Sequence, residues 1–202
     1  NFTKNKKLKS LLTVIGDYQK KRGLNLYEAS ITEKENKIKF NNISLDHQNK
    51  IIKVDKVYFD YIDSENKNNE LILKRMKENN YELSGSIFNA SNLISNLLED
   101  KSEKKSKIFK NDIKLNISLN EVFIDDKNLI KDIKGKLKIV DSEIISSNIS
   151  AFFNDNTNLI FTINTNNDEK ITTLFSSKAK PFVGRYKFIK GFEEGDLNFY
   201  SL

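Results

Sequence analysis

The chain has 202 residues, of which 38% are hydrophobic and 31% are charged, and its net charge is +6. It has no cysteine, which excludes disulfides, thiolate nucleophiles and thiolate metal ligands. No apolar run approaches the roughly 20 residues of a membrane helix. The modest hydrophobic fraction disfavours a compact α/β enzyme and favours a thin architecture in which each strand buries one face.

The basic charge is dispersed along the chain. Lysines alternate with acidic residues, and the three arginines, Arg22, Arg75 and Arg185, lie far apart in sequence. Nucleic-acid sites favour clustered Arg and Lys on one face. We therefore expect no nucleic-acid partner, and a basic nucleic-acid-binding domain is a low-ranking alternative. An A+T-rich genome, which supplies Lys, Asn and Ile codons, accounts for the composition.

The first predicted element is a helix that ends in a basic turn before Gly23. Its apolar residues recur at helical spacing: Leu8, Leu11, Leu12, Ile15 and Tyr18. Alternating residues then predict strands over 23–31, 37–45 and 51–62. In the last of these the apolar residues change parity between Val54 and Val57, which indicates a bulge.

A hairpin follows, with strands over 70–76 and 80–87 joined at residues 77–79. The period then changes to that of a short helix, capped by Asn89 or Ser91. Its apolar stripe consists of Leu93, Ile94, Leu97 and Leu98. Residues 99–107 are polar or charged throughout and predict a solvated loop.

The second half begins with the strictest alternation in the chain, over 111–124, and further strands are predicted over 132–140, 143–153, 157–166 and 170–175. A closing helix runs from Ala179 to Lys190. Its apolar side consists of Ala179, Phe182, Val183, Tyr186 and Ile189. Gly195 then turns the chain into a last strand.

These elements predict a mainly β fold: a long antiparallel meandering sheet, curved or taco-like with an apolar inner face, plus two or three short amphipathic helices. Residues 1–202 form one β-rich region. It also divides into two units, 1–100 and 101–202, since Gly23 and Gly195 each follow an apolar helix and precede a strand.

The sequence offers no group placed for catalysis. His47 is the single histidine and lies in a polar turn, and Glu193 and Glu194 are adjacent acids beside a glycine. Phosphate-binding loops, dinucleotide fingerprints and nucleophile elbows are absent from the sequence. We expect no enzyme activity, no cofactor and no metal.

The one-sided alternation leaves two architectures open. Two sheets can stack face to face, or one curled sheet can leave an apolar trough. Such a trough would solvate acyl chains at about 25 cal/mol per Å² of apolar area removed from water. The residues predicted to line it are Ile113, Leu115, Ile117, Leu119, Ile133, Leu137 and Ile139.

Two segments resemble the AsmA-like envelope proteins of the YhdP type. The closing segment 176–202 is similar to their C-terminal signature, in which a strand ending in small polar residues leads to an Ala-led apolar helix and a Gly turn. Matching positions are Ala179, Phe182, Val183, Tyr186, Phe188, Ile189, Phe192, Gly195 and Leu197. The acidic pair that precedes the Ala in the family is here Ser177 and Lys178. The segment 81–100, "YELSGSIFNASNLISNLLED", resembles the family's strand–Gly–helix element.

The resemblance implies a segment of a longer protein anchored in the inner membrane of a Gram-negative-type cell, with the anchor outside residues 1–202. Its partners would be phospholipid acyl chains and the rest of the same chain. The implied function is phospholipid transport between inner and outer membrane through a periplasmic apolar groove, in support of outer-membrane integrity. The closing helix would cap one edge of the sheet. The alternative is a structural or interaction β-domain with a closed core.

Overall fold

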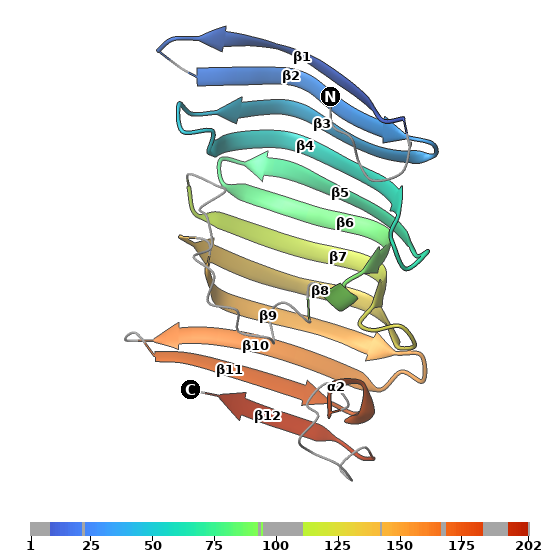
Figure 1. Cartoon of the computed structure of the whole chain (residues 1–202). Helices are drawn as coiled ribbons and strands as arrows, with labels where there is room; N and C mark the ends of the chain where they lie inside the picture. Colours follow the sequence, from blue (N-terminus) through green and yellow to red (C-terminus); the bar gives the residue numbers. More distant parts are fainter. Residues whose placement is uncertain are drawn as a thin grey trace.

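The computed structural model describes residues 9–21, 23–92, 94, 111–141, 143–166, 169–183 and 194–201. Within them the chain forms one sheet of 12 strands in chain order (Figure 1). The strands are β1 (Leu11–Gln19), β2 (Gly23–Glu33), β3 (Asn36–Leu45), β4 (Ile51–Ile62), β5 (Asn68–Lys77), β6 (Asn80–Asn89), β7 (Ile113–Phe123), β8 (Leu129–Val140), β9 (Glu143–Phe153), β10 (Asn158–Asn166), β11 (Glu169–Ser176) and β12 (Leu197–Ser201). The predicted mainly β meander is confirmed.

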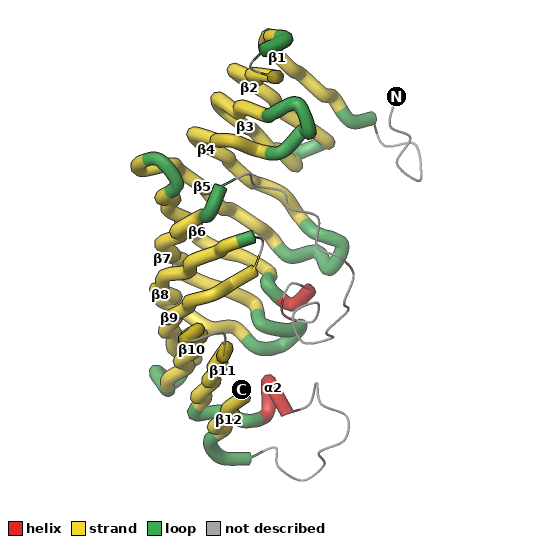
Figure 2. Tube along the Cα trace, turned by 90° about the vertical axis from the view of Figure 1, so that its left-hand side faces the viewer, coloured by secondary structure: helices red, strands yellow, loops and turns green. Residues whose placement is uncertain are grey.

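The sheet is curved and does not close on itself (Figure 2). Among the described residues, helical structure is short: it comprises α2 (Lys180–Val183) and the helical residues Ser91, Asn92 and Ile94. Both segments lie on the same side of the sheet (Figure 2). The described strands therefore form a single open layer, and the division into two units remains a prediction.

One strand pair breaks the antiparallel pattern. β6 and β7 pair in parallel, whereas the other ten neighbouring pairs are antiparallel. A parallel pair needs a connection of a dozen or more residues, because the chain must travel back along the sheet before the second strand starts. Residues 90–112 supply it, and they include the predicted helix start. There Asn89 Oδ1 accepts a hydrogen bond from Ser91 N at 3.2 Å, which assigns the capping role to Asn89.

The predicted helix at the N-terminus is wrong, because residues 11–19 form the edge strand β1. β1 pairs with β2 along its length, from Leu11 opposite Thr32 to Gln19 opposite Gly23. Apolar residues occupy both faces of the strand, and this double pattern imitates a helical stripe. The β-branched run Thr13-Val14-Ile15 and the following glycine disfavour a helix and suit a strand.

At two places in the sheet, the buried side chains of a strand switch between even-numbered and odd-numbered residues. A residue with a left-handed backbone conformation lies at or beside each place. Val54 and Val57 are both buried and belong to one cluster, which confirms the predicted phase slip. The predicted bulge is wrong, because the β3–β4 register continues without a shift from Phe40 opposite Val57 to Ile43 opposite Val54. Asn42, which lies in the neighbouring strand, has φ of 50°. A second change separates Ile130 from Ile133, both buried, across Asp132, which has φ of 52°. Asn and Asp tolerate this backbone region better than most residues.

Two hairpin turns share the sequence pattern Asp-x-x-Asn-Lys, at residues 46–50 and 63–67. In each turn the Asp carboxylate accepts hydrogen bonds from two backbone N–H groups further along the chain. The Asn adopts φ of 60° in the first turn and 59° in the second. These side chains fix the turn geometry without glycine.

Candidate functional site

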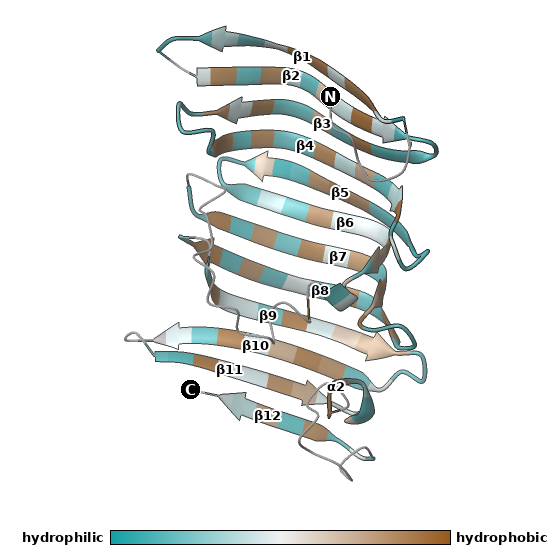
Figure 3. Ribbon diagram, viewed as in Figure 1, coloured by the Kyte–Doolittle hydropathy of each residue, from teal (hydrophilic) through white to brown (hydrophobic). Residues whose placement is uncertain are grey.

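The strand register brings all seven predicted groove residues onto one face of the sheet. In the β7–β8 pair, Ile113 lies opposite Ile139, Leu115 opposite Leu137, Ile117 opposite Gly135 and Leu119 opposite Ile133. Residues at alternate positions share a face, so these cross-strand pairs form consecutive apolar rungs. Figure 3 shows the corresponding alternation of hydrophobic and hydrophilic residues along the strands.

The seven residues differ in exposure. Ile113 and Leu119 are each 6% exposed and Ile133 is 5% exposed. The other four are half-buried: Leu115, Ile117, Leu137 and Ile139. The middle rungs therefore offer more accessible apolar surface than the rungs at the ends.

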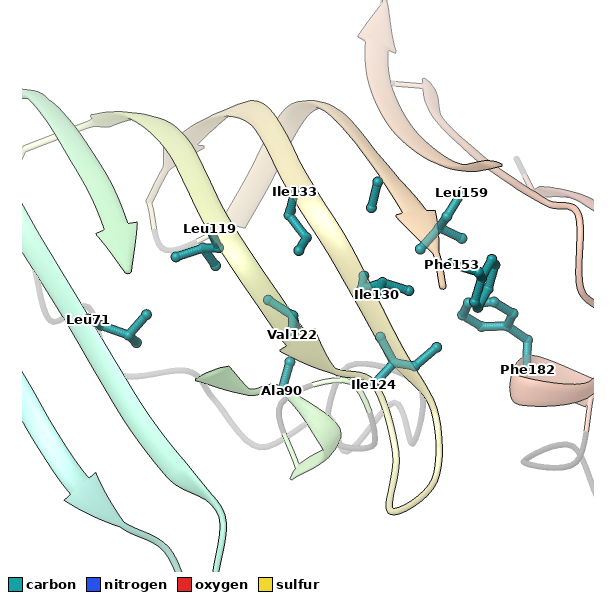
Figure 4. Packing of buried hydrophobic residues seen from close by; sticks show 11 residues of the cluster. Leu71, Ala90, Leu119, Val122, Ile124, Ile130, Ile133, Phe153, Leu159 and Phe182 are labelled. Carbon is teal, nitrogen blue, oxygen red and sulfur yellow. The ribbon is translucent and has the colours of Figure 1, made fainter. Parts of the chain in front are cut away.

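Two hydrophobic clusters extend this face over the neighbouring strands. The first joins Ile113 to β3, β4 and β6, and its buried members are Ile43, Val54, Val57, Tyr81 and Ile113. The second joins β5 to β10 and α2 (Figure 4), and its buried members are Leu71, Ala90, Leu119, Val122, Ile124, Ile130, Ile133, Ala151, Phe153, Leu159 and Phe182. Most of these residues were not among the predicted groove residues. Alternation in their strands signalled one buried face, but sequence does not show which strands share it.

The described start of the predicted closing helix, α2, packs on the same face. Ala179, Phe182 and Val183 are 3–7% exposed, and Phe182 belongs to the cluster that contains Leu119. The Phe182 ring lies next to the Phe153 ring of β9 in Figure 4, with Leu159 of β10 close by. Backbone N–H groups of Phe182 and Val183 donate to Ala179 O, each at 3.0 Å. The other two residues predicted for this helix, Tyr186 and Ile189, lie outside the described residues, as does its predicted end at Lys190.

A charged contact fixes the approach to α2. Lys178 Nζ lies 2.7 Å from Asp155 Oδ2 in the β9–β10 turn and 5.3 Å from the centre of the Phe153 ring. The hydrogen bond from Lys178, with a second from Thr157, lowers the pKa of Asp155 from 3.8 to about 2. The contact holds the start of α2 against the β9–β10 turn, although both groups stay accessible to water.

Ser147 is a polar side chain buried among the hydrophobic residues. It is 2% exposed and lies between Leu137 and Ile163 on the neighbouring strands. Its hydroxyl has no hydrogen-bond partner among the residues that the structure describes. A buried polar group without a partner destabilises the fold.

A buried polar network lies at one end of the parallel β6–β7 pair, which we call the parallel joint. Asn69 is 1% exposed; its Nδ2 donates to Asp63 Oδ2 at 3.2 Å and to Lys67 O at 3.0 Å. Its Oδ1 accepts from Asn89 N at 2.8 Å. Asn89 Nδ2 also donates to Asp63 Oδ2 at 2.7 Å. The network links the β4–β5 turn to the end of β6.

The electrostatics of Asp63 follow from this network. Burial acts to raise its pKa, but hydrogen bonds from Lys67 N, the amides of Asn89 and Asn69, and Glu65 N outweigh burial and leave the pKa below 3.8. Lys67 Nζ continues the network to Asp125 O, 3.1 Å away in the β7–β8 connection. The charged groups thus tie together the two hairpins on either side of the parallel joint.

The described residues contain no group of three or more His, Asp or Glu side chains placed to hold a metal ion. His47 is exposed in the β3–β4 turn, and Glu194 is exposed beside Gly195, whereas Glu193 lies outside the described residues. Among the helices that the structure describes, none is long and apolar enough to span a membrane.

Comparison of the chain with protein-family models, with curated proteins and with solved structures finds no match.

Proposed function

We propose that this chain is a non-enzymatic segment of a lipid-handling protein, in which the apolar face forms the inner face of a groove for phospholipid acyl chains. The observation that supports the proposal is an open, curved, single-layer sheet whose buried hydrophobic residues form two clusters, each spanning several neighbouring strands. A lipid tail lying across the middle rungs would contact Leu115, Ile117 and Leu137. Each methylene that leaves water there contributes about 0.8 kcal/mol.

The resemblance to AsmA-like envelope proteins supports the same proposal. The segment that carries much of that resemblance begins with α2, whose Phe182 belongs to the second hydrophobic cluster. In this proposal α2 caps one end of the groove. The whole protein would lie mainly in the periplasm and move phospholipid between inner and outer membrane.

A structural or interaction domain is the second candidate. Its support is the low exposure of Ile113, Leu119 and Ile133, whose side chains are already covered. In this alternative the apolar face only stabilises the sheet, and no lipid contacts it.

Photo-crosslinking distinguishes the two candidates. Benzoyl-phenylalanine at Leu115 or Leu137 faces the proposed groove, whereas the same group at Asn116 or Lys136 lies on an adjacent rung of the opposite face. In the presence of vesicles of phosphatidylcholine alone, which carry no net charge to attract the lysine-bearing face, we expect lipid adducts, identified by mass spectrometry, from the first two positions only. Equal labelling from both faces, or no adduct from Leu115 and Leu137, would contradict the groove.

A further inference from the structure

The face of the sheet opposite the apolar clusters carries a concentration of positive charge. Lys134, Lys136 and Lys138 alternate along β8, and Lys114 of β7 lies directly opposite Lys138. We call these four residues the lysine patch. All four are exposed. Alternate residues of a strand are about 7 Å apart, so the four ammonium groups share a small area.

The lysine patch is not neutralised by its neighbours. The residues opposite its members on β7 and β9 are uncharged: Asn116, Ser118, Ser146, Asn148 and Ser150. Within the described residues, none of the four lysines forms an ion pair. Carboxylates lie at its borders: Glu82 beside Asn116, Glu143 and Asp112 near the strand ends, and Glu121 beyond Ser118, where it pairs with Lys131 at 3.8 Å.

Like charges directly opposite each other destabilise a sheet. The Lys114–Lys138 pair therefore opposes folding, and an anionic partner would relieve the repulsion. This charge complementarity identifies the kind of ligand that fits the face.

Exposed apolar side chains border the patch on the same face. Phe152 is 39% exposed and Ile160 is 40% exposed. Ile160 lies opposite Ser150, which in turn lies opposite Lys134. Basic residues beside exposed aromatic and aliphatic groups are typical of surfaces that bind the headgroup region of anionic membranes.

We propose that the lysine patch docks this sheet onto an anionic lipid surface, with Phe152 and Ile160 contacting the interface. Nucleic acid fits less well, because strands β7–β9 contain no arginine and no aromatic residue lies among the four lysines. The docking does not depend on the acyl-chain groove, which uses the other face of the sheet.

The test is sedimentation of the 202-residue chain with vesicles of phosphatidylcholine alone or with added phosphatidylglycerol. The patch variant replaces Lys114, Lys134, Lys136 and Lys138 with Gln. The control variant replaces Lys37, Lys39, Lys53 and Lys74 of strands β3–β5 with Gln. It loses the same charge, but each of its lysines lies beside an acid: Lys39 pairs with Glu28 at 3.1 Å and Lys53 with Asp55 at 3.7 Å, Lys37 lies opposite Asp60, and Lys74 lies opposite Glu82.

We expect the wild type to bind only the anionic vesicles and to dissociate at high salt. Each Lys→Gln change in the patch should weaken binding about fivefold, and the control variant should lose far less. A variant with Arg at the four patch positions should bind anionic vesicles like the wild type. If the quadruple Gln variant is unfolded, the single variants Lys134→Gln and Lys136→Gln test the same loss of vesicle binding. Equal loss in the control, equal binding to neutral vesicles, no binding to anionic vesicles, or displacement from vesicles by single-stranded DNA at low concentration would overturn the proposal. Crosslinking from Leu115 should be unchanged in patch variants, so the two proposals fail separately.

Discussion

The buried amide of Asn69 gives the most exacting test of how the parallel joint is held. Replacing it by Leu keeps the branching of the side chain at Cγ but removes three hydrogen bonds. Asn89 N–H, whose acceptor is Asn69 Oδ1, loses its partner in a buried position. Asp63 loses one donor, whereas Lys67 O keeps its hydrogen bond from Asp63 N at 3.0 Å.

The magnitude follows from these losses. An orphaned buried backbone group costs about 1–3 kcal/mol, and a hydrogen bond to a charged group is worth about 1.5–3 kcal/mol. Because local relaxation recovers part of the sum, we expect the free energy of unfolding to fall by about 3–5 kcal/mol. Typical domains have only about 5–15 kcal/mol in total.

Urea unfolding followed by circular dichroism measures this change. Asn68→Leu is the matched control, because Asn68 is the adjacent, exposed residue of the same strand. Its free energy of unfolding should change by less than about 0.5 kcal/mol. A loss below about 1 kcal/mol for Asn69→Leu would refute the view that this amide organises the joint.

Three further predictions concern single residues. Ser147→Ala should raise the free energy of unfolding by about 1 kcal/mol, because it removes an unpartnered buried hydroxyl. The control Ser146→Ala, on the exposed face, should leave the free energy of unfolding unchanged. A destabilised Ser147→Ala variant would show that the hydroxyl has a partner. Phe182→Ala should lower the unfolding free energy by about 3–5 kcal/mol in urea titrations, and a loss below about 1 kcal/mol would show that α2 contributes little to the second cluster. Asp155 has a folded pKa of about 2, below the ordinary 3.8, so its stabilising contact with Lys178 is complete above pH 3.8 and is lost as the pH falls towards 2. Thermal melts between these two pH values should show a smaller acid-induced drop for Asp155→Asn than for the wild type, and identical drops would exclude this contact as a source of acid sensitivity.

Sequence predicted the strands best where one face is clearly apolar. The alternation from Ile113 to Leu119 fixed both the strand and the buried side, since only one register of the pleat hides all four apolar residues. The same reasoning failed for β1. Leu11 and Leu12 point to opposite faces of this strand, so its apolar residues fit both the spacing of a helix and a strand with two apolar faces. Pairing with β2 decides in favour of a strand.

Features that depend on pairing between distant segments were not visible in the sequence. The parallel joint requires knowing where the chain returns after residue 90, and the Asn69–Asn89 contact joins residues 20 positions apart. The grouping of positive charge on one face was also not visible in the sequence. Lysines that alternate with polar residues look dispersed along the chain, yet the register places Lys114 beside Lys138.

The single parallel joint has a geometric consequence for the two outermost strands. In a meander with an even number of strands, the first and last would run in opposite directions. Here one change of direction is omitted, so β1 and β12 run the same way. A block with this polarity can be repeated edge to edge with every copy facing and pointing alike, each junction being another parallel pair. A continuous sheet of any length could then be assembled from such blocks by repeating one rotation and translation, since each strand pair adds to the twist of the sheet.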